Sequence, residues 1–167
     1  LAQYGESVAG MPYSEALKLL SIYTTGSLAG VFCSSLALRT FLSPQMMLLG
    51  CTTVSTLALA VACFFPSPTV MFGFSFIFGF AAAGGVVQLG LAMMAAQFPR
   101  ARGRATGIYY SAGSISNFTM PLITAWIVRE WSIHEIFKFD VIISGCGILL
   151  AVFIAWRSRH AQAIDLN

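Results

Sequence analysis

Neutral polar residues recur along one face of the segment 105–129, where their side chains could bind a polar solute through hydrogen bonds. Asn117 falls near the middle of this segment, and an amide is costly in hydrocarbon unless it is paired or hydrated. We therefore expect Asn117 to face protein or a water-filled cavity, with an interhelical hydrogen bond that only stabilises packing as an equal alternative. Steps of three or four residues place six positions on this face of a helix: Thr106, Tyr110, Gly113, Asn117, Pro121 and Thr124.

Pro121 removes one backbone hydrogen bond from the same segment. This predicts a hinge, which serves either solute binding or packing alone.

The segment 69–96 offers a second candidate for solute contact, Gln88. It is the strongly polar member of a face whose other members are small: Ala81, Gly84, Ala92 and Ala95. Small residues let a helix or a ligand approach closely, so Gly84 and Gly85 are packing candidates. A structural hydrogen bond is the alternative role for Gln88.

The segment 14–38 carries a GxxxG pattern at Gly26 and Gly30. This pattern is typical of close helix packing in membranes. Tyr23 and Ser27 share its face and are further candidates for the solute pathway. The alternative is that this face serves helix packing alone.

Other chemistries find no support in the sequence. It contains no HExxH or GxSxG motif and no Cys–His couple at membrane depth, so we expect no enzyme, no metal site and no cofactor. The cysteines lie in apolar runs without the spacing of a zinc site or a disulfide framework. No ionisable residue falls near the middle of any predicted span, where proton relays usually place one.

The composition indicates which elements position these residues. Hydrophobic residues make up 57% of the chain, charged residues only 9%, and the mean hydropathy is +0.81. A membrane helix needs about 20 predominantly apolar residues. We therefore predict an all-α, polytopic membrane helix bundle in a single membrane domain over 1–167, with five spans at about 14–38, 44–65, 69–96, 105–129 and 138–157.

Five spans put the connecting loops alternately on two sides, and the charges divide between those sides. One side carries six basic residues, Arg39, Arg100, Arg102, Arg104, Arg157 and Arg159, against Asp165. The other carries Lys18, Arg129 and Lys138 against Glu6, Glu15, Glu130, Glu135 and Asp140. The positive-inside rule places the first side, with the C-terminus, in the cytoplasm. This asymmetry explains the net charge of +3 without nucleic acid as a partner.

Three of these arginines, Arg100, Arg102 and Arg104, lie close together in the predicted loop QFPRARGRATG. They can fix the topology and attract anionic lipid. Alternatively they form a cytoplasmic gate, for which Arg102 is the preferred contact. Trp126 and Trp131 fall at the opposite side, at the headgroup level that indole rings prefer.

The segment Phe98-Pro99 followed by Arg102-Gly103-Arg104-Ala105-Thr106-Gly107 resembles the loop between the tenth and eleventh helices of major facilitator superfamily transporters. The Gly-rich stretch from Phe78 to Gly90 is similar to the tenth helix of that family. The first-half signature of the family is missing around Arg39. The resemblance therefore implies the C-terminal half, helices 8 to 12, with residues 1–4 as the tail of the seventh helix.

The resemblance implies part of a secondary transporter that moves a small organic solute by alternating access, possibly coupled to protons as in a symporter. It also implies that the tenth helix, with Gln88, lines a central cavity. The partners would be the solute, the lipid bilayer of the plasma (cell inner) membrane and the missing N-terminal half of the same chain. The alternative is a stand-alone membrane scaffold that recruits a partner through its GxxxG face.

Overall fold

The structure, a computed structural model, describes residues 1–40, 43–131 and 133–164, and it describes the side chains of 1–38, 43–131 and 135–157. Most of the described residues lie in helices, joined by short connections. The elements are α1 (Ala2–Ser7), α2 (Tyr13–Thr40), α3 (Pro44–Phe64), α4 (Pro68–Phe78), the π-helical segment η1 (Gly79–Val86), α5 (Val87–Gln97), α6 (Arg102–Glu130) and α7 (Ile133–Ile164).

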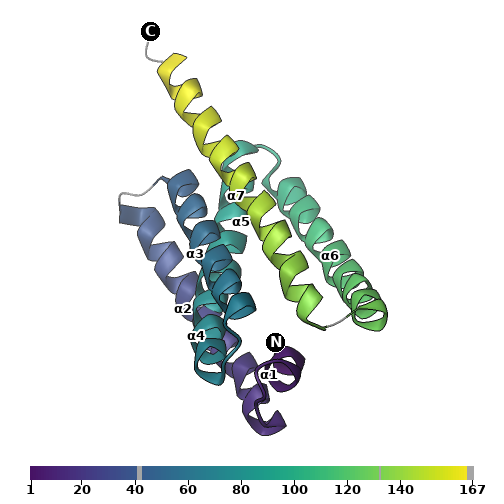
Figure 1. The fold of residues 1–167 in the computed structure, drawn as a ribbon. Coiled ribbons are helices and arrows are strands. Elements are labelled where there is room, and N and C mark those ends of the chain that lie inside the picture. Colours follow the sequence, from purple (N-terminus) through teal and green to yellow (C-terminus); the bar gives the residue numbers. More distant parts are fainter. Residues whose placement is uncertain (41–42, 132, 165–167) are drawn as a thin grey trace.

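The chain runs up and down through the bundle (Figure 1). The connections after α2 and α5, and the end of α7, lie at one end of the bundle, which we call the arginine end because it carries residues 100, 102 and 104. Helix α1 and the connections after α3 and α6 lie at the other end, which we call the tryptophan end after Trp126 and Trp131. The side chains of Arg39 and Arg159, and Asp165 as a whole, fall outside the described residues.

A proline begins each of two helices, and a serine caps one of them. Pro44 and Pro68 are the first residues of α3 and α4, positions that lack an intrahelical partner for the missing amide proton. The hydroxyl of Ser67 accepts a hydrogen bond from the Val70 amide at 3.4 Å and so caps α4. The left-handed φ of +66° at Gly10 turns the chain between α1 and α2.

Four helical stretches of the described chain are long and apolar enough to cross a membrane: Tyr13–Leu38, Pro44–Phe64, Pro68–Gln97 and Glu135–Arg157. Four of the five predicted spans overlap these stretches. The other predicted span, 105–129, forms part of α6, whose 29 residues are long enough to cross. Its serines, threonines, Asn117 and basic first turn make it too polar to count with the other four.

Two boundaries also differ from the sequence prediction. Arg102 and Arg104 lie in the first turn of α6 rather than in a loop, so the connection is shortened to residues 98–101. Helix α7 begins at Ile133, five residues before the predicted start of the last span. Asp140 therefore lies about two turns inside a helix.

The buried core gathers at the tryptophan end, where α1, α3, α4 and α7 meet. The rings of Tyr4 and Phe137 stack with their centroids 3.6 Å apart, and the Phe74 ring lies 5.9 Å from that of Phe137. Leu19 and Met71 are fully buried beside them. Many other large apolar side chains are exposed, as a surface facing lipid requires.

Helix α6 stands at the side of the bundle and contacts α5 and α7 (Figure 1). Every residue from Tyr110 to Leu122 is exposed. The polar face that the sequence predicts is therefore not covered by the described part of the chain.

Candidate functional site

Helix α2 crosses α4 and η1 with the two backbones in direct contact. A Cβ atom added at Gly26 or Gly30 would collide with the carbonyl oxygen of Phe76 or Phe80, respectively. A Cβ atom at Gly84 would lie 2.5 Å from the Ser27 carbonyl oxygen and 2.7 Å from the Gly30 Cα atom. Close crossings of this kind need small residues on both helices. The glycines of both segments thus occupy one contact.

The π-helical segment η1 lies in the middle of the membrane-spanning stretch 68–97. Its wider hydrogen-bonding pattern interrupts the α-helical ladder, and interrupted backbone carbonyls need other donors. The buried hydroxyl of Ser34 on α2 donates a hydrogen bond to the Gly84 carbonyl oxygen at 3.2 Å. Gly85 faces α3, where the Cys51 Sγ atom would lie 2.7 Å from an added Cβ atom.

The π-helical segment changes which residues of α5 face the core. The sequence predicts that Gln88 continues the face of Gly84, which assumes an unbroken α-helix. In the structure the buried positions run from Gly84 and Gly85 to Leu89, which is fully buried, whereas Gln88 is half-buried. Gln88 lines neither of the two cavities described next.

Tyr109, which the sequence reasoning missed, joins α6 to α5. Its hydroxyl donates a hydrogen bond to the Val87 carbonyl oxygen at 2.8 Å, at the residue that follows η1. The ring passes over Gly90, where an added Cβ atom would lie 2.9 Å from the hydroxyl oxygen. No signal in the sequence separates Tyr109 from Tyr110, because the acceptor is a backbone carbonyl whose position depends on η1.

A cavity of about 520 Å³ opens beside this hydrogen bond, and we call it the α5–α6 cavity. It is lined by Val87 and Tyr109 together with three predicted residues, Tyr110, Gly113 and Asn117. Nothing lies within 4 Å of a Cβ position at Gly113, so the wall is open there. The lining offers neutral hydrogen-bond donors and acceptors and no carboxylate, which suits an uncharged polar group.

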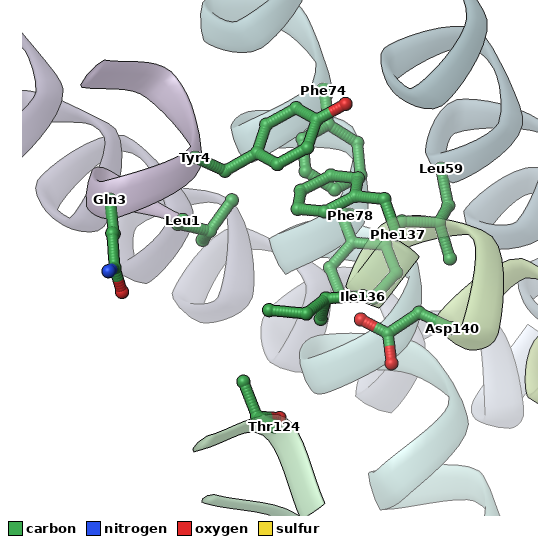
Figure 2. Close-up of a pocket in the computed structure, with 10 residues that line it drawn as sticks. All are labelled: Leu1, Gln3, Tyr4, Leu59, Phe74, Phe78, Thr124, Ile136, Phe137 and Asp140. Atoms are coloured by element: carbon green, nitrogen blue, oxygen red, sulfur yellow. The ribbon is translucent and has the colours of Figure 1, made fainter. Parts of the chain in front are cut away.

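A second cavity, of about 260 Å³, lies at the tryptophan end (Figure 2). Thr124 lines it, so the structure separates Thr124 from the other polar positions predicted on its face. The aromatic wall includes Phe137 and Tyr4. Burial, and to a lesser degree Cys63, raises the pKa of the Tyr4 hydroxyl to about 12.

Asp140 also lines this second cavity, and Figure 2 shows its carboxylate beside Ile136 and Phe137. The predicted span 138–157 already contains Asp140 near its start, where it was counted only among the charges of one side. The signal that could have located it is its apolar context, since phenylalanine and valine flank it.

The remaining predicted residues lie away from both cavities. Tyr23 and Ser27 lie on α2 at the crossing, and the Tyr23 ring is 6.5 Å from that of Phe78. Helix α6 continues through the exposed Pro121 to Glu130. Arg100, Arg102 and Arg104 are exposed, and within the described side chains none of the three forms an ion pair. The described residues likewise contain no group of histidine, cysteine and acidic side chains that could hold a metal ion.

Comparison with known proteins places these features in a wider context. Residues 3–166 match the family model described as Major Facilitator Superfamily. The chain is 52% identical over 159 residues to inner membrane transport protein YdiM of Escherichia coli (strain K12), covering 95% of this chain and 39% of YdiM. It is 36% identical over 167 residues to inner membrane transport protein YdiN of the same organism, covering 100% of this chain and 39% of YdiN.

A third relative is the uncharacterized MFS-type transporter YfkL of Bacillus subtilis (strain 168), 32% identical over 159 residues, with 95% of this chain and 40% of YfkL covered. The chain thus spans about two fifths of the length of the curated relatives that it matches. No solved structure matches it.

Proposed function

The chain belongs to the major facilitator superfamily, and on that premise we propose that it forms the C-terminal half of a secondary transporter that moves a small polar organic solute by alternating access. The relatives named as transporters support transport as the broad function. Since the match covers 39% of YdiM, an N-terminal half of the same chain is the expected partner.

The observation that carries the proposal is the open polar face of α6. The hydroxyls of Ser116 and Thr119 donate to carbonyl oxygens of their own helix, but the Asn117 amide would be left unpaired at considerable cost if it faced lipid. The run from Tyr110 to Leu122 is exposed in this part of the chain, and Tyr110 and Asn117 line the α5–α6 cavity. A second helical half that encloses a water-filled pathway along this face would satisfy these groups.

In this proposal Asn117 and Tyr110 contact the solute in the α5–α6 cavity, and Thr124 contacts it nearer the tryptophan end. Gln88 is kept as a further contact that becomes accessible when the helices move. Arg102 serves as the gating contact at the arginine end, where the six basic residues favour the cytoplasmic side.

The proposed location is the plasma membrane with the C-terminus in the cytoplasm, in keeping with relatives named as inner membrane proteins. Proton-coupled symport is the finer form of the proposal. The middle of these helices contains no ionisable residue in the sequence. The group that binds the proton would then lie elsewhere, in the N-terminal half or close to it.

The scaffold alternative loses its main support in the structure. Gly26 and Gly30 are both buried against α4 and η1 of the same chain. The GxxxG face is therefore occupied within the bundle and is not a free surface for another protein.

The test is chemical labelling of the full-length parent protein, which needs no knowledge of the solute. With native cysteines replaced, Asn117→Cys should react with a charged, membrane-impermeant thiol reagent, because the pathway is hydrated. Phe118→Cys, on the next residue of α6 and at an exposed apolar position, is the matched control and should stay unlabelled. Alternating access further predicts labelling of residue 117 from either side of the membrane. A folded protein whose residue 117 is unlabelled from both sides would refute the pathway.

A further inference from the structure

A slot of about 300 Å³ lies between α6 and α7 at the tryptophan end, apart from both cavities described above. Half of its lining residues are apolar and aliphatic or phenyl: Ile123 and Ile127 from the last turns of α6, with Phe139 and Ile142 from the second and third turns of α7. Ile142 is 66% exposed, so the slot is open to the surface of the described part of the chain. A wall of this kind suits acyl chains.

The other four lining residues, which we call the mouth of the slot, have a different chemistry. Trp126 and Trp131 line it and are 62% and 71% exposed, respectively, so their rings are free to contact a ligand. Glu135 and Lys138, on the first turns of α7, complete the mouth and form an ion pair with each other. Both charged side chains remain partly exposed, so each can also contact a molecule in the mouth.

We propose that this slot binds one zwitterionic phospholipid whose headgroup carries a primary ammonium, of the phosphatidylethanolamine type. The lysine ammonium pairs with the lipid phosphate, and the glutamate carboxylate accepts hydrogen bonds from the lipid ammonium. The indole faces attract the same cation. The acyl chains then lie along Ile127, Phe139 and Ile142, which belong to the apolar part of the lining.

The charge balance favours this lipid over an anionic one. The mouth offers one positive and one negative group, which match the two charges of the headgroup. The headgroup of phosphatidylglycerol carries the same phosphate but no ammonium, so it would offer no cation to Glu135. The proposal concerns the slot between α6 and α7 and does not depend on transport.

The experiment uses the delipidated full-length parent protein, titrated separately with phosphatidylethanolamine, phosphatidylcholine and phosphatidylglycerol, with bound lipids counted by native mass spectrometry. We expect phosphatidylethanolamine to bind most tightly. Glu135→Gln should make phosphatidylethanolamine bind no more tightly than phosphatidylcholine, because the carboxylate accepts hydrogen bonds from the primary ammonium. Lys138→Gln should weaken both zwitterionic lipids by about tenfold, as expected for loss of a charge-assisted contact to phosphate.

The matched controls are Arg129→Gln and Glu130→Gln, which change an exposed pair at the same end of the bundle but outside the slot. They should leave the lipid preference unchanged. Equal binding of the three lipids, tighter binding of phosphatidylglycerol, or an equal loss in the controls would overturn the proposal. In the unsubstituted protein, brominated phosphatidylethanolamine should quench tryptophan fluorescence more than brominated phosphatidylcholine does, and equal quenching would also contradict it.

Discussion

Replacing Gly84 by alanine tests the contact between α2 and η1 most directly. The added Cβ atom would lie 2.5 Å from the Ser27 carbonyl oxygen and 2.7 Å from the Gly30 Cα atom, and both are backbone atoms that no rotamer change can move. Ordinary contact begins at 3.4 Å, so the two segments must separate by about 0.9 Å.

That separation has two costs. Overpacking of this kind costs about 1–3 kcal/mol. The hydrogen bond from Ser34 to the Gly84 carbonyl is already 3.2 Å long, and its loss adds roughly 1 kcal/mol. We therefore expect Gly84→Ala to destabilise the protein by about 2–4 kcal/mol.

The assay measures the apparent unfolding temperature of the detergent-solubilised parent protein. Samples are heated to a series of temperatures, and size-exclusion chromatography measures how much folded protein remains. A decrease on the order of 5 °C is expected. Gly73→Ala is the matched control, because Gly73 lies on α4 in the same continuous stretch and an added Cβ atom meets nothing within 4 Å there. Equal unfolding temperatures for the two variants would refute the assigned backbone contact.

Two further substitutions probe the carbonyl oxygens around η1. Ser34→Ala leaves the buried carbonyl in η1 without its donor and should cost about 1–3 kcal/mol; the exposed Ser35→Ala should have no measurable effect in the same heating assay. Tyr109→Phe removes the hydrogen bond to Val87 and should cost about 1 kcal/mol. Tyr110→Phe is its control, and an equal decrease in unfolding temperature for both tyrosine variants would contradict the assignment.

The helices of this chain could be predicted because their signals are local. Long apolar runs show where membrane helices lie, and Pro44 and Pro68 are the first residues of the helices in which they were expected. The boundaries near residues 102 and 133 were placed too late, because basic and aromatic residues there suggested a loop although they continue a helix.

The candidate site was predictable only within one regular helix. Tyr110, Gly113 and Asn117 line one cavity, as their spacing in α6 predicts. The side of the helix on which Gln88 lies was not predictable. It depends on the π-helical segment, which the small residues between positions 79 and 86 do not reveal. Tyr109 depends on the same segment and was missed for the same reason.

Helices meet in two different ways in this bundle, and the two kinds of contact differ in how easily they can move. Where α2 crosses η1, backbone lies on backbone at Gly30 and Gly84, with no flexible side chains between them to absorb a displacement. Helix α6 instead meets the bundle through α5 and α7, and one tyrosine hydroxyl joins it to Val87. Local opening is easiest where few buried contacts hold an element. Within this part of the chain, amide hydrogen exchange should therefore be slow along α2 and η1 and fast along the middle of α6. The polar face thus lies on a helix that opens locally more easily than α2 and η1 do.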